Sequence, residues 1–480
     1  MQQPDPKDYD WPLPNSLSDE AAAMEYIASL QACAEGIRSV LMHLPEATVV
    51  NFIDTLSRVF DESPSPERSV SSLDILFRND ADAEDFVQAA LTNTTVFHLW
   101  FRLCGHSQPL GNYLARHGWR EFFKGGIDDL SQPITREFVQ RRVSERVTGG
   151  FEIKAALRLT CQECSMRTLY HETILQQPLE TIGQEISAIA DGCIQSSLDH
   201  LRMTDEIKFC VLAFGKLGGC ELNYSSDIDL VFVFQGDKVA GRKARQLAEK
   251  TVALLNDVTE HGRVFRVDTR LRPHGKRGRL APSVQETTDY YFSYGSTWER
   301  QALLKARPCA GDIEIGEALL ERLQGWVYRK YLTSEEINQM KTLKRIIEKR
   351  TDARDESFRD VKTGFGGLRD IEYVVQFLQL LNGGRLPSVR NRATLPALKA
   401  LAENGILHTD EAGQLADGYR FLRAVEHRLQ LEHGMQTHTL PNNLHGLLFI
   451  ARAMGIQAER QLDVTRRFVS ELQAHTTCIR

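Results

Sequence analysis

Apolar residues recur three and four positions apart through most of the first two hundred residues. This spacing is typical of helices that bury one face, and residues 20–44 and 184–203 show it. We therefore predict a helical N-terminal region over residues 21–204. Residues 1–20 are rich in Pro, Asp and Ser, and we expect them to form a flexible N-terminus.

Short apolar runs bounded by turn residues replace the helical spacing after residue 206. Runs of strand length occupy residues 208–215, 228–235 and 263–273. Between the last two runs we predict a helix. Its apolar side carries Leu247, Val252, Leu255 and Val258, and Gly262 ends it. These elements predict a small mixed sheet with helices over residues 205–312.

The helical spacing returns after about Asp312 and continues to the end of the chain, which predicts a C-terminal helical bundle over residues 330–480. The fold class we expect is α+β and mostly helical, with the mixed sheet flanked by helical regions on both sides. The strand region is not repeated along the chain, which indicates one catalytic unit.

Length and composition favour a protein of several domains. A chain of 480 residues exceeds what one hydrophobic core usually serves, so roughly two to four domains are expected. No uninterrupted apolar stretch approaches the ~20 residues that a membrane-spanning helix needs. The acidic, proline-rich start lacks the basic-then-apolar pattern of a secretory signal, so we expect a cytoplasmic protein with no membrane partner.

Charge and cysteine content narrow the classes of partner and cofactor. The net charge of −6 argues against a nucleic-acid partner, because phosphate binding normally needs a basic surplus. Nine cysteines without framework spacing indicate reduced thiols. Cys161 and Cys164 form a C-x-x-C pair inside a predicted helix. Because no second pair completes a zinc site, we expect both to pack within that helix.

A glycine-rich turn follows the first predicted strand. Gly215, Gly218 and Gly219 let the backbone approach a ligand closely and point amides at an anion. The turn therefore predicts a phosphate cradle, although a lone turn of this composition is more often a simple chain reversal.

Three aspartates accompany this turn. Asp227 and Asp229 stand at the start of the second strand, where the period of two puts both carboxylates on one face. Asp268 lies in the third apolar run, where a lone charge is unfavourable unless it is paired or metal-bound. Neighbouring carboxylates repel unless a cation lies between them, and oxygen ligands suit Mg²⁺, with Mn²⁺ as the alternative. We predict that these three acids are catalytic and hold two metal ions.

Two such ions activate an attacking hydroxyl and stabilise a departing pyrophosphate, which is the chemistry of nucleotidyl transfer. Besides the glycines, five side chains are candidates for contacting the nucleotide phosphates: Lys216, Ser225, Ser226, Arg270 and Arg272. A D-x-D pair alone is usually a solvated strand end, and the two arginines fit a surface salt-bridge role equally well. The order of strand, glycine turn, D-x-D and third aspartate, however, resembles polymerase-beta-like nucleotidyltransferases.

Four longer motifs narrow this resemblance to one family. GKLGGCELNYSSDIDLVFVF, VFRVDTRLRPHGKRGRL, TWERQALLKAR and KTGFGGLRDIEYVVQFLQL resemble the glutamine-synthetase adenylyltransferase and adenylyl-removing enzymes of bacterial nitrogen control. The resemblance covers about residues 137–441. It implies ATP or ADP as substrate or product, and AMP transfer to a tyrosine of glutamine synthetase or phosphorolytic removal from it. A PII-type signal protein is a further candidate partner.

The resemblance also assigns roles to individual residues. It carries over Asp227, Asp229 and Asp268 as the metal-binding acids, and it marks as nucleotide contacts Lys216, Gly218, Gly219, Arg270 and Arg272. Two further groups lie in matching motifs and either reach the catalytic cleft or serve packing and helix ends: Trp298, Glu299 and Arg300, and Arg369, Asp370 and Glu372. The sequence leaves both interpretations open.

One feature departs from the family, whose members usually contain two catalytic halves in about double this length. This chain shows one half, and ELNYSSDID is most like the N-terminal, AMP-removing half. The chain is therefore a stand-alone short member or half of a longer or split protein. Two alternatives compete with this function. A template-independent polymerase-type nucleotidyltransferase is disfavoured by the acidic balance, and a non-catalytic nucleotide-sensing or PII-sensing regulatory module is disfavoured by the intact acid triad.

Overall fold

The structure is a computed structural model that describes residues 44–78, 80–201, 207–331, 359–458 and 460–479. The flexible N-terminus expected at residues 1–20 and nearly all of the helix expected at residues 20–44 lie outside this range. Within the described ranges, no helix combines the length and the apolar character that crossing a membrane requires.

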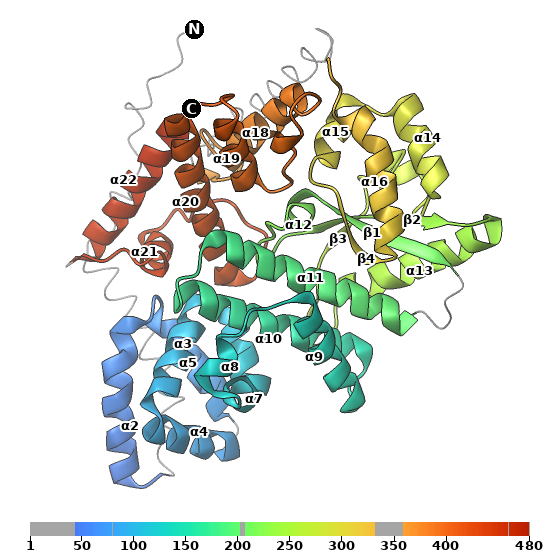
Figure 1. Cartoon of the computed structure of the whole chain (residues 1–480). Coiled ribbons are helices and arrows are strands. Elements are labelled where there is room, and N and C mark those ends of the chain that lie inside the picture. Colours follow the sequence, from blue (N-terminus) through green and yellow to red (C-terminus); the bar gives the residue numbers. More distant parts are fainter. Residues whose placement is uncertain (1–43, 79, 202–206, 332–358, 459, 480) are drawn as a thin grey trace.

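Helices make up the described part of the N-terminal region, as the spacing predicts (Figure 1). They are α2 (Glu46–Val59), α3 (Pro66–Phe77), α4 (Asp80–Thr92), α5 (Thr94–His106), α6 (Gln108–Tyr113), α7 (Trp119–Phe123), α8 (Gly126–Leu130), α9 (Arg136–Thr148), α10 (Ile153–Thr173) and α11 (Leu179–Leu201). Their core is rich in aromatic rings: Phe86 packs edge-on against Trp100 and Trp119, with ring centroids 5.0 and 5.2 Å apart. Cys161 and Cys164 pack on α10 as free thiols, as expected.

A four-stranded mixed sheet follows, with the strand order β3-β2-β1-β4. The strands are β1 (Lys208–Phe214), β2 (Ile228–Gln235), β3 (Val267–Asp268) and β4 (Arg307–Gly311). β1 is antiparallel to β2 and β4, and β2 is parallel to β3. The first two predicted strands are confirmed, and the sheet confirms the α+β class.

The third strand is much shorter than predicted. β3 ends at Asp268 because the chain turns there: the Asp268 side chain accepts a hydrogen bond from the Arg270 amide at 2.8 Å. The Arg272 guanidinium then donates to the Thr269 carbonyl at 2.7 Å and holds the turn closed. β4 was missed altogether, because its sequence RPCAG is short and contains Pro and Gly.

The predicted end of the helix after β2 is also wrong. α13 (Lys238–Asn256) stops before Val258, whose side chain is 68% exposed. Arg158 of α10 explains the early end, because its guanidinium donates to carbonyls at the C-terminus of α13 and just beyond: Leu254, Asp257 and Gly262. The Leu254 carbonyl, which an additional helical turn would have engaged, is thus satisfied by a side chain from another helix.

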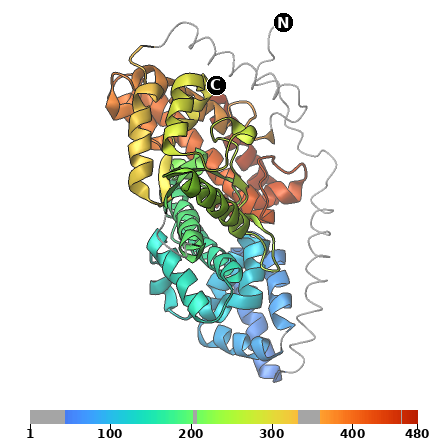
Figure 2. The same ribbon diagram turned by 90° about the vertical axis from the view of Figure 1, so that its right-hand side faces the viewer.

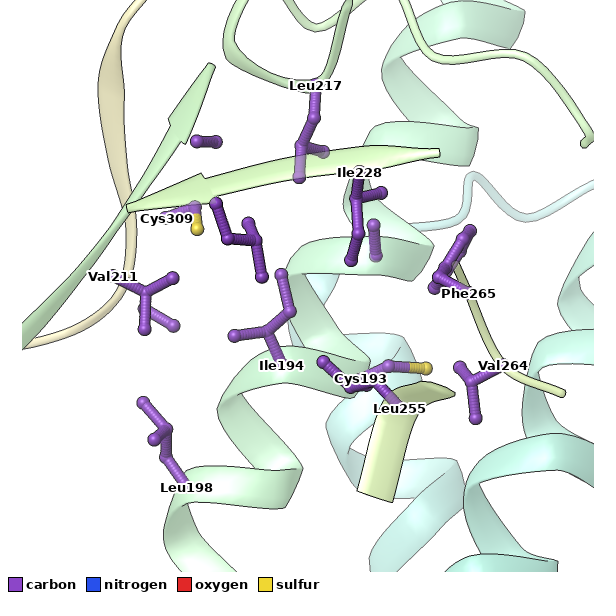
Figure 3. Close-up of a cluster of buried hydrophobic side chains, with 14 of the residues drawn as sticks. Cys193, Ile194, Leu198, Val211, Leu217, Ile228, Leu255, Val264, Phe265 and Cys309 are labelled. Atoms are coloured by element: carbon purple, nitrogen blue, oxygen red, sulfur yellow. The ribbon is translucent and has the colours of Figure 1, made fainter. Parts of the chain in front are cut away.

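Both faces of the sheet are covered. Val211 and Ile228 point to one face, where they pack with Ile194 and Leu198 of α11 and Leu255 of α13 (Figure 3). Alternate strand residues point to the opposite face and pack with a second helical layer. That layer contains α14 (Val284–Tyr294), α15 (Thr297–Leu303) and α16 (Ile313–Val327).

The C-terminal bundle completes the described chain. Its helices are α18 (Leu368–Asn382), α19 (Thr394–Glu403), α20 (Thr409–His433), α21 (Leu444–Ala453) and α22 (Gln461–Ile479). In Figure 2 the green helices α11 and α13 lie between the blue N-terminal helices and the orange C-terminal ones. The bundle has its own apolar core, and α20 extends from it to contact N-terminal helices and, through Glu426, Lys216 of the sheet domain.

A buried polar network joins the three regions. Glu172 of α10 accepts a hydrogen bond from the Tyr224 hydroxyl at 2.8 Å. It also lies 3.2 Å from His427 and 3.0 Å from Arg428, both on α20. Burial alone would raise the pKa of Glu172, but the charges and hydrogen bonds of these partners hold it far below its usual range. The network is therefore built around an ionised carboxylate.

Candidate active site

The three predicted acids lie at one end of the sheet. Asp229 and Asp268 are directly paired in the parallel β2–β3 ladder, and Asp227 immediately precedes β2. On β2, Asp229 projects from the same face as Val231 and Val233, which face the α14–α16 layer. Because paired residues of neighbouring strands project from the same face, Asp229 and Asp268 stand side by side there.

Negative charge accumulates at Asp229. Burial and the nearby carboxylates of Asp268 and Asp227 raise the pKa of Asp229 to about 6. The pKa of Asp268, by contrast, is lowered by its hydrogen bonds from Arg270. The structure thus brings the three acids close enough to influence one another electrostatically.

The two outer acids are ion-paired with arginines. Arg266 contacts the Asp227 carboxylate, and Arg270 contacts that of Asp268. Across the described residues, no three His, Cys, Asp or Glu side chains are grouped tightly enough to hold a metal ion. The donor set still suits a divalent cation, since it consists of carboxylate oxygens and carries uncompensated negative charge at Asp229. Shared binding requires Asp227 and Asp268 to turn from their arginines.

A pocket of about 460 Å³ opens beside the acids. It is lined by Asp227, Arg266, Val267, Asp268, Thr269, Arg270, Arg272 and Lys276. Two carboxylates and four cationic side chains therefore share one concave surface. Such a mixture suits a ligand that carries both anionic groups and a bound cation, as a metal–phosphate complex does.

The candidate phosphate contacts differ in what they touch. Arg270 is 65% exposed and its guanidinium forks onto Asp268. The Arg272 guanidinium donates within the loop that it closes, to the Thr269 hydroxyl at 2.9 Å and to the Lys276 carbonyl at 3.1 Å. Lys216 is ion-paired at 3.0 Å with Glu426 of α20. Arg272 is therefore bonded to its own loop and Lys216 to a buried carboxylate, so both side chains have a role in the fold.

Ser225 and Ser226 lie apart from the acid pocket. They line a different cavity of about 350 Å³, between α10 and the end of α20. The Ser225 amide donates to the Gln430 side chain at 2.9 Å, and Ser226 is buried. The structure does not bring these two hydroxyls to the acid pocket.

The glycine turn forms a single helical turn, α12 (Gly215–Gly218). Gly215 has a φ of +55°, and a Cβ there would lie 2.6 Å from the Asp229 Oδ2 atom. Gly218 and Gly219 instead face Lys305 and Arg392, whose main-chain oxygens lie 2.2 and 3.1 Å from the positions of the missing Cβ atoms. Gly215 is therefore the glycine whose small size keeps room at the acids, whereas the other two permit close packing.

Replacing Gly218 by alanine should strongly destabilise the fold. The new Cβ would lie 2.2 Å from the Lys305 carbonyl oxygen and 2.8 Å from that of Ala213, both backbone atoms that cannot rotate away. We expect the free energy of unfolding to fall by about 2–4 kcal/mol. The matched control is Gly413→Ala in α20, where the added methyl meets nothing within 4 Å and should raise stability by about 0.5–1 kcal/mol. Urea unfolding of both variants measures the contrast.

The structure shows the surroundings of four residues from the two ambiguous motif groups. Glu299 and Arg300 are buried, Glu299 in a capping box at the start of α15 and Arg300 over the Trp326 ring, so packing accounts for both. Trp298 is 46% exposed. Glu372 of α18 lies at the boundary with the sheet domain, where the charges of Lys305 and Lys216 help to lower its pKa against the effect of burial.

The contribution of α20 was not predicted from the sequence. Glu426 is fully buried and contacts Lys216, Arg423 and His438 at 3.0, 3.2 and 2.8 Å. The signal was present, because Arg423, Glu426, His427 and Gln430 fall at helical spacing on a buried face. Charged residues at such positions need partners, and here most partners come from the glycine turn and the loop that follows it.

Comparison with known proteins identifies a family for part of the chain. Residues 98–322, which contain the glycine turn and the three acids, match the family model described as glutamate-ammonia ligase adenylyltransferase. These residues form a domain of that family. The resemblance drawn from the sequence motifs is thereby confirmed. Residues 338–480 match a second model, described as GlnD PII-uridylyltransferase.

Named relatives of this adenylyltransferase family agree with the first match. A bifunctional glutamine synthetase adenylyltransferase/adenylyl-removing enzyme from Hahella chejuensis is 34% identical over 358 residues, which cover 68% of this chain and 37% of the relative. The protein of the same name from Aromatoleum aromaticum is 36% identical over 406 residues, covering 82% and 40%. That from Xanthomonas campestris is 41% identical over 290 residues, covering 59% and 29%. The chain thus spans at most two fifths of the length of these relatives.

Proposed function

We propose that this chain transfers AMP at a tyrosine of glutamine synthetase, attaching it from ATP or removing it by phosphorolysis to give ADP. The observation that carries the proposal is the pairing of Asp229 with Asp268 on adjacent strands, beside Asp227, within a domain of the adenylyltransferase family. The relatives bear names that state both reactions. The second family match supports a PII-type signal protein as a regulatory partner.

In this proposal Asp227, Asp229 and Asp268 hold divalent metal, Mg²⁺ or in its place Mn²⁺. When bound, the metal would act as a Lewis acid at the phosphate and lower the pKa of an attacking hydroxyl. The chain itself supplies the cationic wall of the pocket, formed by Arg266, Arg270, Arg272 and Lys276, which attracts and orients an anionic substrate. Arg266 and Arg270 have a second role, because they neutralise Asp227 and Asp268 until a cation takes their place.

The direction we propose for this domain is AMP removal. An attacking phosphate must approach an already anionic phosphodiester, which needs positive charge beyond the metal. Four cationic side chains line the acid pocket, and ELNYSSDID is most like the AMP-removing half of the family.

A pair of reactions tests the proposal. Adenylylated glutamine synthetase carrying labelled AMP is incubated with the protein and Mg²⁺, with and without inorganic phosphate. We expect labelled ADP to appear only when phosphate is present. Incubation of unmodified synthetase with labelled ATP tests the opposite reaction, AMP attachment. Ready labelling of the synthetase without phosphate-dependent ADP release would show that attachment is the activity, and inactivity in both assays would reject the proposed function.

A further inference from the structure

A cavity of about 350 Å³, which we call the boundary cavity, lies where the glycine turn meets α11 and the C-terminal bundle. Its walls come from the first turns of α11, the glycine turn, the start of β4, the loop before α19, and α20. In Figure 1 the start of α11 lies beside α20, and an ion pair of 2.8 Å between Arg420 and Glu180 joins the two helices. Among the described residues, none lines both this cavity and the pocket at the acids. The boundary cavity is therefore a separate candidate site.

Positive charge predominates in the walls of the boundary cavity. Its described lining contains four arginines and two carboxylates: Arg307, Arg390, Arg392 and Arg423, and Glu180 and Glu221. Both carboxylates have cationic partners outside the lining, Glu180 in Arg420 and Glu221 in Lys305 at 2.7 Å. The carboxylates are thus neutralised from outside, and the cavity keeps a surplus of positive charge.

Arg423 of α20 is the most deeply buried of the lining arginines, with 1% of its surface exposed. Its guanidinium donates to the Glu426 carboxylate at 3.2 Å and to the Glu221 carbonyl. Its Nε–H group has no hydrogen-bond acceptor among the described residues, and neither has the Nε–H group of Arg307. A buried donor without an acceptor is unfavourable. Because both residues line the cavity, these two donors indicate a ligand that supplies acceptors.

Arg392 adds further donors where the cavity opens to solvent. Its side chain is exposed, and its Nε–H group donates to the Ala306 carbonyl at 2.9 Å. No carboxylate in the described part of the chain pairs with it, so its two terminal amino groups are available to a ligand. Its main-chain oxygen lies 3.1 Å from the position that a Cβ of Gly219 would take, which fixes its backbone against the glycine turn. Arg390, by contrast, is engaged in the fold, since it donates to the Gly383 carbonyl at 2.7 Å.

We propose that the boundary cavity binds a small molecule that carries a carboxylate or phosphate group. The anionic oxygens accept hydrogen bonds from Arg423, Arg392 and Arg307, because a guanidinium matches the geometry of both groups. The rest of the ligand contacts the apolar part of the lining, which consists of Leu179, Ala393, Leu395 and Pro396. The inference does not depend on the proposed function, since the acids take no part in this site.

A ligand at this position connects separate regions of the fold. Arg392 and Arg423 belong to the C-terminal bundle, whereas Arg307 begins β4 of the sheet domain. A molecule that binds all three requires the folded arrangement and has no equivalent site in the unfolded chain. Its binding must therefore raise the thermal unfolding midpoint, Tm, in a saturable way.

Thermal unfolding of the full chain tests the site. Tm is measured in a chelating buffer while sulfate, phosphate, acetate or succinate is titrated, with chloride added to keep the ionic strength constant. The proteins are the wild type, Arg392→Gln, Arg392→Lys, Arg270→Gln and Arg466→Gln. We expect saturable stabilisation of the wild type by at least one of these anions. R392Q should raise the resulting Kd at least about tenfold, and R392K should recover part of that loss.

Two control variants separate the boundary cavity from other cationic surfaces. Arg466 is the matched control, because its side chain is 59% exposed on α22 and lies 3.7 Å from Asp463. Arg270 lines the pocket at the acids, so R270Q should keep the wild-type Kd if the anion binds in the boundary cavity. Tighter binding of sulfate and phosphate supports a phosphate-bearing ligand, and tighter binding of acetate and succinate supports a carboxylate. No saturable effect of any anion, an unchanged Kd in R392Q, or loss of binding in R270Q would each overturn the inference.

Discussion

Asp229→Asn should reduce turnover by at least about a thousandfold while leaving the protein more stable. Turnover falls because the proposed metal site loses the acid that stands between the other two. Stability rises because the folded-state pKa of about 6 exceeds the ordinary value of 3.8, so the ionised carboxylate disfavours folding at neutral pH. Without divalent metal at pH 7.5, we expect a gain of about 1–3 kcal/mol in the free energy of unfolding.

Assays of AMP release and attachment, together with urea unfolding in a chelating buffer, measure both effects. The sign of the pH dependence is a further check, because the wild-type contribution of this group falls as pH rises from 3.8 to about 6 and that slope disappears in the variant. Asp417→Asn is the control: its side chain is 71% exposed on α20, and neither activity nor stability should change noticeably. Wild-type turnover in Asp229→Asn would refute the acid triad.

Glu426→Ala should cause the largest loss of stability of any variant considered, about 3–5 kcal/mol. The substitution removes a fully buried carboxylate and leaves the charges of Lys216 and Arg423 without their shared partner. Burial would raise the pKa of Glu426, yet these cations and His438 hold it far below its usual range, so the carboxylate is ionised in the folded protein. A corresponding fall in the urea midpoint is the expected measurement.

An exposed ion pair in the same bundle supplies the comparison. Glu403→Ala breaks a contact with Lys399 between side chains that are 62% and 77% exposed, and should cost less than about 1 kcal/mol. Similar losses in Glu403→Ala and Glu426→Ala would show that the buried cluster contributes little. Apolar replacement of Glu426 together with Lys216 should recover part of the stability, since no single charge is then stranded.

The features predicted correctly from the sequence are those that depend on local spacing. The alternation in β1 and β2, and the D-x-D at the start of β2, follow from side chains that must point to opposite faces of one sheet. The proximity of Asp268 and Asp229 could be predicted from the sequence because both lie in apolar strands. Two of the four motifs that carried the family resemblance cover β2 and β3, and the other two cover α15 and α18.

What the sequence could not predict depends on distant partners. α13 ends early because Arg158, on a helix about one hundred residues upstream, takes the carbonyls near its end. Lys216 was interpreted from its motif alone, whereas its neighbour is Glu426, 210 residues downstream. Ser225 and Ser226 lie close to the acids in sequence, but the turn that carries them faces another cavity. Spacing along the chain holds no information about such contacts.

The Glu172 network sets limits on how this protein can be recombined with its relatives. Its members come from α10, from the loop before β2 and from α20, so crossovers at either region boundary separate side chains that share one buried carboxylate. A chimera that inherits Glu172 from one parent and His427 and Arg428 from another folds well only if the second parent supplies the same two partners for the carboxylate. Functional hybrids should therefore keep these three segments together or exchange them as a set.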